Sequence, residues 1–238
     1  MSPQRRWVLI TVVTVAGIAI TAGLGRWQLQ RADEKEALQA SIDAREQEPV
    51  LDAASVGREI APQYLHRRVV ARGRWLPART VYLDNRQMFG RPGFFVVTPL
   101  QISSTGAVVL IQRGWVPRDF EDRQKVPTIE TPSGDVIIQG RLAMPPSKLY
   151  DLGGEERGPI RQNLDLRQFR LETGLALSEM TVQQTGPASE GLAREWPPIN
   201  TGVSKHYGYA FQWFGLCALM AILYGWFQLV PRLRSRQH

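Results

Sequence analysis

The sequence predicts a membrane protein of the α+β class, in which two transmembrane helices flank a mainly antiparallel-β, barrel-like domain. Three observations support this prediction. Two long uncharged segments lie near the ends of the 238-residue chain, and arginines flank both on the outer side. Between them the sequence breaks into short β-type runs separated by Gly, Pro, Ser and Asn. Beside the helices, the chain has room for one ordinary globular domain.

The two uncharged segments cover residues 7–24 and 207–230. At about 1.5 Å per residue, each helix is long enough for most or all of the hydrocarbon core of a bilayer. Tyrosines and tryptophans lie near both ends of the second segment, as expected at the two membrane interfaces. In the first segment, small residues four apart, Gly17 with Thr21 and Ala19 with Gly23, are typical of closely packed membrane helices. Chance in an apolar helix is the alternative.

The flanking arginines predict the orientation. Arg5 and Arg6 precede the first segment, and Arg232, Arg234 and Arg236 follow the second. The positive-inside rule then makes residues 1–6 and 231–238 cytoplasmic tails and residues 25–206 a periplasmic domain. A cleaved signal peptide is the alternative for the first segment, but the run is longer than an ordinary h-region and lacks a small-x-small cleavage site. Only six residues precede the run, too few for a mitochondrial transit peptide, which favours a multi-pass protein of the bacterial inner membrane.

Charge and cysteine content exclude several classes of function. The chain has a net charge of +7 and a pI near 10.0, but without the five terminal arginines it carries 24 basic against 22 acidic side chains. The basicity is therefore mainly a membrane-topology signal, and no patch is dense enough to predict nucleic-acid binding. The single cysteine, Cys217, lies in the second apolar segment, so internal disulfides and CxxC redox chemistry are excluded.

The middle of the chain predicts a helix followed by strands. Helix formers and charges spaced three or four apart continue from the first span to Pro49. A second helix is predicted around residues 164–173, and residues 186–205 are predicted to be a linker back to the membrane. The predicted strands, curled into a small barrel, are residues 63–75, 80–83, 94–102, 107–116, 135–144 and 179–184.

The sequence contains no recognisable catalytic motif. The histidines, His66, His206 and His238, are scattered along the chain, and with one cysteine they form no metal site of ordinary spacing. The polar clusters at residues 84–86 and 121–123 are candidates for an active site, but mixed charge in β-turns is usually solvated surface.

His206 lies one residue before the second apolar segment. With Tyr209, Ala210 and Trp213 it falls at helical spacing on one face. An imidazole beside aromatic side chains at the membrane interface is suited to ligate a haem iron. An interfacial histidine without a ligand is the alternative, and spacing alone favours it.

Four segments together resemble the Surfeit-locus family of cytochrome oxidase assembly proteins. Residues 24–31, LGRWQLQR, are similar to the family's GxWQxxR box, and residues 83–100, LDNRQMFGRPGFFVVTPL, to its NR...G..G....TPL segment. Residues 112–117, QRGWVP, are similar to the RGWVP segment, and residues 206–214, HYGYAFQWF, to the HxxYAxxWF entry to the second span. The segments occur in the family's order and cover both helices and the middle domain.

The resemblance implies a non-enzymatic assembly factor, or chaperone, for haem-copper cytochrome c oxidase in the respiratory chain. It implies that the protein binds haem a, transiently, or promotes its insertion into the catalytic subunit. The implied partners are that subunit, haem a synthase and membrane lipid. His206 matches the family's proposed haem-binding histidine, although Tyr207 stands where many members carry an aliphatic residue. The motif positions whose roles stay open are Trp27, Arg31, Asn85, Arg86, Arg113, Gly114 and Trp115. For these, turn glycines at 90, 93 and 114 and a core Trp115 are the structural alternative.

Two other functions compete with assembly. A membrane-anchored periplasmic ligand-binding or sensor module would have a cytoplasmic tail of only eight residues for signalling. A membrane-anchored enzyme would need a catalytic constellation, which the sequence does not supply.

Overall fold

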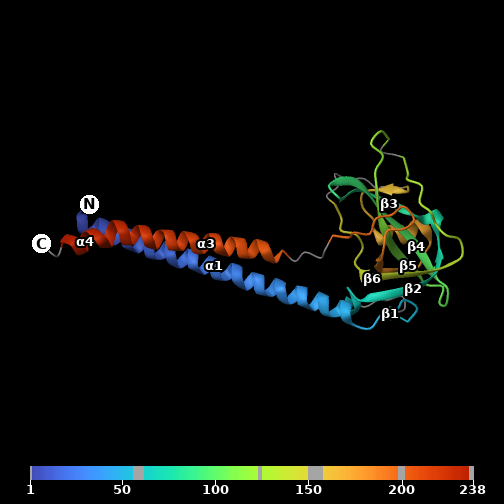
Figure 1. Ribbon diagram of the computed structural model, residues 1–238, viewed down its shortest axis with the longest axis horizontal. Helices are drawn as coiled ribbons and strands as arrows, with labels where there is room; N and C mark the ends of the chain where they lie inside the picture. The colour runs from blue at the N-terminus through green and yellow to red at the C-terminus, as the bar shows by residue number, and fades with distance from the viewer. Residues whose placement is uncertain (1, 56–61, 123–124, 150–157, 198–201, 236–238) are drawn as a thin grey trace. The chain divides into compact units, whose positions relative to one another are not determined.

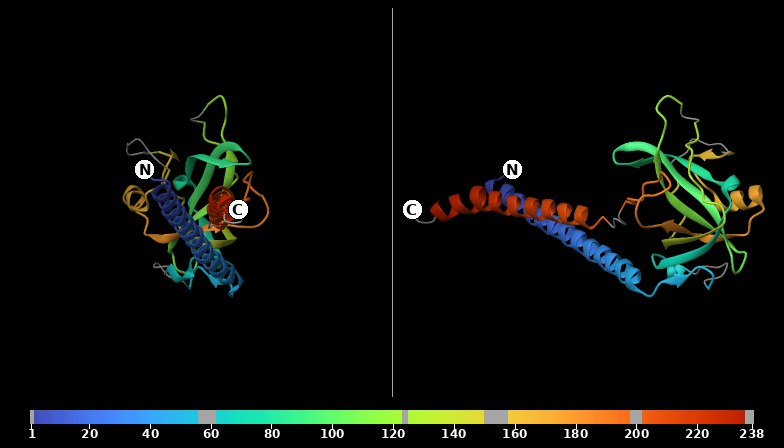
Figure 2. Two further views of the ribbon diagram at one scale, coloured as in Figure 1. Left: turned by 90° about the vertical axis from the view of Figure 1, so that its left-hand side faces the viewer. Right: turned by 45° about the vertical axis from the view of Figure 1, so that its right-hand side comes forward.

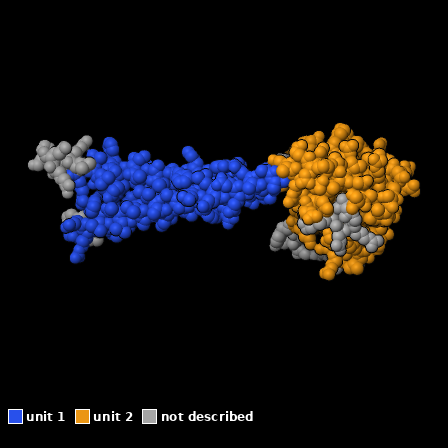
Figure 3. Space-filling view, turned by 90° about the horizontal axis from the view of Figure 1, so that it is seen from below, with its two compact units in different colours: residues 1–41, 198–238 blue, residues 42–197 orange. Residues whose placement is uncertain are grey.

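The computed structural model describes residues 2–55, 62–122, 125–149, 158–197 and 202–235. The chain forms two compact units, shown in different colours in Figure 3. The first, which we call the helix unit, contains residues 1–41 and 198–238. The second, the β unit, contains residues 42–197.

Helix α1 (Pro3–Gln47) begins at a proline, which suits the first turn of a helix, and ends just before Pro49. At 45 residues it is about 68 Å long, roughly twice the thickness of a bilayer core. The prediction that the first apolar helix continues through the charged segment as far as Pro49 is confirmed.

The second apolar helix has three parts in sequence. These are α3 (Val203–Tyr224), the π-helical turn η3 (Gly225–Leu229) and α4 (Val230–Ser235). By length and composition, both this helix and α1 can cross a membrane. The two predicted spans, residues 7–24 and 207–230, lie inside these helices.

In the helix unit, α1 and α3 lie side by side and run in opposite directions (Figures 1 and 2). Part of the less exposed residues of α1 form a series with spacings of four and three, the heptad pattern of helices that pack along their length. The residues of this series are Trp7, Thr11, Thr14, Ile18, Thr21, Gly25, Gln28 and Ala32. The corresponding series on α3 is Val203, His206, Ala210, Trp213, Cys217, Met220 and Tyr224.

Small and polar residues dominate the α1 side of this helix seam. The Gly25 backbone lies so close to α3 that an added Cβ would approach the Phe214 ring to 2.8 Å. The hydroxyls of Thr11 and Tyr224 lie 2.8 Å apart and form a hydrogen bond. Such contacts replace the hydrophobic effect, which does not drive helices together in lipid.

Of the two predicted small-residue pairs, only one belongs to the seam. Thr21 is buried and Gly17 lies against Met220. Ala19 and Gly23 are exposed, and a Cβ on Gly23 would meet nothing within 4 Å. The prediction for that second pair is wrong because the heptad places it on the opposite side of α1.

The β unit is built on a closed ring of five strands. These are β2 (Arg68–Trp75), β6 (Asp135–Ala143), β8 (Leu177–Gln184), β5 (Val108–Pro117) and β4 (Arg91–Ile102), and pairing of β2 with β4 closes the ring. The neighbours β6, β2, β4 and β5 have the order of a Greek key. The predicted barrel is thus confirmed, and most of its pairs are antiparallel.

One barrel pair is parallel, which the sequence did not predict. Strand β8 runs parallel to β5. Two short outer pairs are also parallel, β1 (Leu51–Asp52) with β2 and β7 (Ile160–Arg161) with β3 (Val81–Met88). Such pairs join segments distant in sequence, so no hairpin turn signals them.

Strand β3 continues β2 along the same edge of β4. The last residues of β2 pair with the end of β4, the turn η2 (Pro77–Arg79) follows, and β3 pairs with the first half of β4. A bulge between Leu83 and Arg86 interrupts this pairing, and Asn85 there has a φ of 59°. The predicted strand at 80–83 is therefore too short, because the bulge hides its continuation to Met88.

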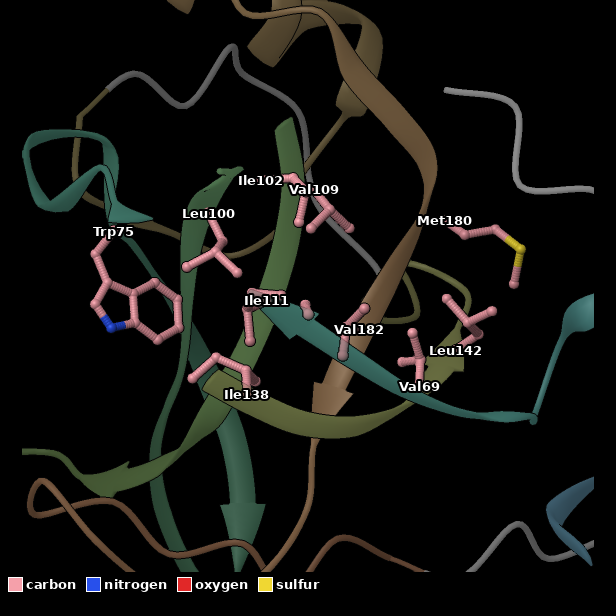
Figure 4. Close-up of a cluster of buried hydrophobic side chains, with 11 residues drawn as sticks. Val69, Trp75, Leu100, Ile102, Val109, Ile111, Ile138, Leu142, Met180 and Val182 are labelled. Atoms are coloured by element: carbon pink, nitrogen blue, oxygen red, sulfur yellow. The ribbon is translucent and has the colours of Figure 1, made fainter. Parts of the chain in front are cut away.

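The barrel interior is a hydrophobic cluster contributed by all five strands (Figure 4). Eleven buried residues form it: Val69, Ala71, Trp75, Leu100, Ile102, Val109, Ile111, Ile138, Leu142, Met180 and Val182. Outside the ring, α2 (Leu166–Thr173) packs Phe169 into a second cluster with Leu83 and Leu110. The Asp165 carboxylate caps α2 by accepting from the backbone N–H groups of Arg167 and Gln168.

Two other predicted boundaries differ. The first predicted strand, 63–75, begins only at Arg68, after the 3₁₀ turn η1 (Pro62–Tyr64). Much of the predicted linker at 186–205 is packed rather than free: Leu192 is 1% exposed and Ala193 pairs with Trp115. Residues 198–201 of that segment lie outside the described residues.

Candidate functional site

His206 lies in the first turn of α3 and belongs to the helix seam. The helix begins after Gly202, whose φ of 78° is left-handed and suits glycine. His206, Ala210 and Trp213 follow at spacings of four and three along the seam, and Ala210 is 2% exposed. The predicted common face thus includes His206 and Trp213, whereas Tyr209, 51% exposed, lies at its margin.

The closest polar partner of His206 comes from the other helix. Its Nδ1 lies 2.8 Å from Oε1 of Gln28 on α1. An amide oxygen can only accept, so Nδ1 of His206 carries the proton and donates it to Gln28. In a neutral imidazole the lone pair is then on Nε2, which is the nitrogen available to bind a metal.

This hydrogen bond has the form of an outer-sphere contact of a metal-binding histidine. A ring N–H held by a carbonyl or carboxylate oxygen fixes the tautomer and the ring orientation and makes the other nitrogen a better ligand. Gln28 was not predicted as a site residue. Its sequence signal is its place beside Trp27 in the same box, and its position in the seam follows only from the burial pattern of α1.

A second polar contact lies one residue farther along. The Tyr207 hydroxyl donates to Oε1 of Glu36 over 2.8 Å. Together with the Gln28 contact, it ties the first turn of α3 to the polar part of α1. Position 207, where an aliphatic residue is common in the family that this chain resembles, therefore has a polar role here.

The chemistry available around His206 fits a single axial ligand to a haem. Among the described residues, no group of three His, Cys, Asp or Glu side chains is placed to hold a bare metal ion. The contact given for the His206 ring uses Nδ1, and one imidazole nitrogen is enough for an iron whose other ligands come from a porphyrin. Large aromatic side chains on α3, among them Tyr209, Phe211 and Phe214, are exposed and provide apolar surface.

Trp27 and Arg31 lie on α1 but outside the seam. Trp27 is 48% exposed, and the Arg31 guanidinium lies 5.9 Å from its ring centroid. Arg31 also forms an exposed ion pair of 2.7 Å with Glu34. They are therefore not brought into contact with His206 through the helix seam.

Asn85 and Arg86 lie at the bulge of β3. Asn85 is exposed, whereas Arg86 is 5% exposed. Arg86 donates to the backbone carbonyl oxygens of Ser147 and Gln162, each over 2.9 Å. Burial lowers the pKa of the Arg86 guanidinium. Its contacts are those of a structural side chain that joins β3 to two other segments of the β unit.

Arg113 is the largest fully buried side chain of the β unit. It pairs with Glu190 at 2.9 Å and donates to the Thr131 hydroxyl and the Glu130 carbonyl oxygen. Its guanidinium carbon lies 4.6 Å from the Trp75 ring centroid. These partners at its two terminal nitrogens compensate for the burial of the charge, although the buried Nε has no hydrogen-bond partner among the described residues.

Gly114 and Trp115 hold the chain after β8 against β5. The backbone N–H of Trp115 donates to Ala193, and that of Ala193 donates to Trp115, both over 2.8 Å. A Cβ on Gly114 would approach the Ala193 carbonyl oxygen to 2.7 Å, so no side chain fits there. Trp115 is 4% exposed and its indole N–H donates to the Arg86 carbonyl oxygen over 2.8 Å. The core interpretation of Trp115 is confirmed.

In the part of the chain that the structure describes, neither His66 nor the polar cluster at residues 121–123 belongs to a group of three potential metal ligands. His66 adopts a φ of 72°, and burial, followed by the nearby Arg141 charge, lowers its pKa. In the cluster at 121–123, Arg123 lies outside the described residues. The neighbouring Asp119 has a pKa of about 2 because it accepts from Lys125 and from two backbone N–H groups.

The family model that matches this chain is that of the SURF1 family, over residues 15–218. The chain belongs to the SURF1 family. The match contains most of α1 and of α3, the whole barrel, and the pair Gln28 and His206.

Two of the similar proteins match along most of their length, and a third matches over a shorter part. A SURF1-like protein of Rickettsia felis is 27% identical over 222 residues, which cover 90% of this chain and 94% of that protein. Surfeit locus protein 1 of Rattus norvegicus is 27% identical over 251 residues, which cover 95% of this chain and 76% of the rat protein. The cytochrome oxidase assembly protein SHY1 of Saccharomyces cerevisiae is 27% identical over 139 residues, covering 57% of this chain and 36% of the yeast protein.

Proposed function

We propose that this protein is a non-catalytic, membrane-anchored assembly factor for cytochrome c oxidase that binds haem a through His206. The assembly role is supported by membership of the SURF1 family and by the name of the yeast relative. The single observation that carries the haem proposal is the 2.8 Å hydrogen bond from His206 to Gln28. It joins the two motifs that flank the membrane segments and leaves Nε2 as the ligand atom.

Each residue near His206 has a separate role in the proposed haem site. His206 would hold the haem iron through Nε2, and Gln28 would keep the proton on the other ring nitrogen. Trp213 and Tyr209 provide aromatic surface on the same helix for the porphyrin. When bound, haem a supplies the redox-active iron that the oxidase needs, and this chain holds it for transfer to the catalytic subunit.

The proposed topology places this site at the outer face of the membrane. Both α1 and the second apolar helix are long and apolar enough to span a bilayer. With the arginines at residues 5, 6 and 232 in the cytoplasm, residues 7–24 and 207–230 span the bacterial inner membrane and residues 25–206 lie in the periplasm. Reporter fusions at both termini and in the loop after Ser103 test this orientation, and a periplasmic C-terminus would overturn it.

Complementation of a deletion strain tests the assembly role. Cells without the gene should respire in part but contain less oxidase with haem a, because an assembly factor accelerates insertion and carries no electron-transfer centre of the oxidase. Full-length protein should restore the haem a content per oxidase subunit, and the His206→Ala variant should restore it less. Unchanged oxidase haem in the deletion strain would refute the assembly role. If the His206→Ala variant restored the haem a content fully, assembly would depend on protein contacts and not on haem binding by His206.

A further inference from the structure

The first half of β6 is an open edge of the barrel. Strand β6 pairs with β2 along residues 135–141, but it pairs with β8 only over residues 140–143. Within the part of the chain that the structure describes, residues 135–138 therefore have a sheet neighbour on one side only, and we call them the β6 edge. The outward side chains here are exposed, and Ile137 is 60% exposed. An exposed strand edge is a template on which a further strand can pair.

The backbone groups of Ile137 point away from β2, towards the open side. Leu142 of the same strand donates its N–H to the segment that leads into β2 and accepts from it, so the backbone of Leu142 faces β2. Backbone direction alternates along a strand, which turns Gln139 and Ile137 the other way. The Gln139 carbonyl oxygen accordingly accepts from Thr185, after the end of β8. Among the described residues, the N–H and C=O of Ile137 have no backbone partner.

Three of the side chains that point outward from β2 are arginines, Arg68, Arg72 and Arg74. Arg68 donates to a backbone carbonyl oxygen, and Arg74 forms an exposed ion pair with Asp135 at 2.9 Å. Arg72 is exposed and lies directly opposite Ile137 in the pairing of β2 with β6. In the described ranges, the Arg72 guanidinium takes part in no ion pair or hydrogen bond. The β6 edge therefore has a cation beside its exposed apolar residue.

This combination favours an acidic strand as the occupant of the β6 edge. Neighbouring strands lie about 4.8 Å apart, so an added strand would be about 10 Å from β2. The long side chain of Arg72 and a carboxylate side chain of the added strand can meet over that distance, across Ile137. A second copy of this chain, paired edge to edge, would present another Arg72 in place of the carboxylate, and that charge has the wrong sign.

We infer that an extended segment of a partner protein, with alternating apolar and acidic side chains, adds to the β6 edge as a further strand. The N–H and C=O of Ile137 form main-chain hydrogen bonds with the segment, which provide affinity. An apolar side chain of the segment packs on Ile137 and a carboxylate pairs with Arg72, which provide specificity. The inference goes beyond the proposed function and involves neither His206 nor haem.

Binding of a synthetic strand to the purified full-length protein tests the inference. The probe is a fluorescent peptide of alternating valine and glutamate, as long as β6 itself, 9 residues. Two matched peptides carry glutamine or lysine in place of glutamate, and fluorescence anisotropy measures the affinity of all three. We expect one glutamate peptide per chain, bound about fivefold more tightly than the glutamine peptide, which is the upper end of what an exposed ion pair contributes. The lysine peptide should bind most weakly.

Arg72→Gln tests the charge. It should weaken binding of the glutamate peptide about fivefold and leave binding of the glutamine peptide unchanged. Arg79→Gln is the matched control, because Arg79 is exposed in η2 and belongs to neither β2 nor β6. This control removes the same charge from the β unit and should change the affinity less than about twofold.

Ile137→Pro tests the backbone. Proline removes the N–H that points to the open side but none of the hydrogen bonds to β2, so the barrel should still fold. The loss of a main-chain hydrogen bond should weaken binding of the glutamate peptide about fivefold or more. Ile137→Val keeps the N–H and should stay within about twofold of the wild type. The thermal unfolding midpoint checks the fold of Ile137→Pro, and the comparison at Arg72 decides the test if that variant does not fold.

Several results would overturn the inference. Absence of glutamate-peptide binding, or equal affinities of the glutamate and lysine peptides, would exclude an acidic strand. Equal losses for Arg72→Gln and Arg79→Gln would indicate diffuse surface charge, and equal affinities of folded Ile137→Pro and Ile137→Val would exclude strand addition. Wild-type dimers that disappear in Ile137→Pro would assign the edge to a second copy. Displacement of the peptide by short-chain phosphatidylglycerol, lost in Arg72→Gln, would assign the surface to anionic lipid. Each of these results leaves the haem proposal at His206 unaffected.

Discussion

Gln28 and His206 are 178 residues apart in the sequence, yet their side chains meet across the helix seam at 2.8 Å. Each is part of a different motif, one directly after the first apolar segment and one directly before the second. The antiparallel packing of α1 and α3 brings them together. The bond fixes which nitrogen of His206 carries the proton, so Gln28 acts on the proposed haem ligand without touching the haem.

Gln28→Ala should weaken haem a binding about tenfold while His206 is still present. The reason is that the ring N–H of His206 loses its acceptor and the tautomer is no longer fixed. A haem titration of the purified protein, followed by absorbance, measures the change. Gln30→Ala is the matched control, because Gln30 is exposed on the same helix. Equal affinities of the Gln28→Ala and wild-type proteins would show that the hydrogen bond does not serve binding.

Gly25→Val should separate α1 from α3. An added Cβ would lie 2.8 Å from the Phe214 ring, whereas the same change at Gly23 meets nothing within 4 Å. Both changes introduce the same β-branched residue into one helix, so helix propensity cancels in the comparison. The measurement is the disulfide yield between Thr11→Cys and Tyr224→Cys in a Cys217→Ser background. We expect a yield several-fold lower for Gly25→Val than for Gly23→Val, and similar yields would contradict the close packing.

Glu190→Gln should destabilise the β unit by about 3 to 5 kcal/mol, because it leaves the Arg113 charge buried with a neutral partner. Arg113 is 0% exposed, and the Glu190 carboxylate lies 2.9 Å from it. Thermal unfolding of the full-length protein measures the effect. Asp135→Asn, which breaks the exposed pair with Arg74, should leave the midpoint unchanged. A similar small effect at both sites would refute the buried-pair account.

The lowered pKa of His66 predicts that the free energy of unfolding decreases under mildly acidic conditions. Its pKa in the folded protein is lowered, chiefly by burial and then by Arg141, so the unfolded state takes up the proton first as the pH falls. Stability is therefore fully present above pH 6.5, the unfolded pKa, and decreases as the pH falls from there towards the folded pKa. His66→Asn should remove this part of the pH dependence, since Asn tolerates the φ of 72° at this position. Identical Tm profiles of the variant and the wild type between pH 7.5 and 5.5 would contradict the assignment.

The sequence predicted elements whose signal is local. Uncharged length marked both helices, and helix formers up to Pro49 marked the extension of α1. Short β-type runs separated by Gly, Pro, Ser and Asn marked the five barrel strands. The parallel pairing of β5 with β8 was not predictable, since it depends on contacts between segments that no turn connects. The segment after β8 has the composition of a linker, but Leu192 and Ala193 hold it to the barrel.

The candidate site was likewise predicted only where its residues have a local signal in the sequence. His206 and Trp213 were found from spacing on one helix. Gln28 was missed, because pairing it with His206 requires the register between α1 and α3, which neither helix encodes alone. Arg86 and Arg113 were recognised from the sequence as motif positions without a role. Their burial and their hydrogen bonds show that they hold the β unit together.

Absorbance spectroscopy of haem a that co-purifies with the full-length protein tests the central claim most directly. Wild type, His206→Ala and His66→Ala would be purified from cells that make haem a. Removal of the only imidazole in the helix seam deletes little packing area, so His206→Ala should still insert and fold. The account predicts that haem a occupancy falls sharply and the absorption bands shift in His206→Ala, with neither change in His66→Ala. Equal occupancy and identical spectra in wild type and His206→Ala would contradict it.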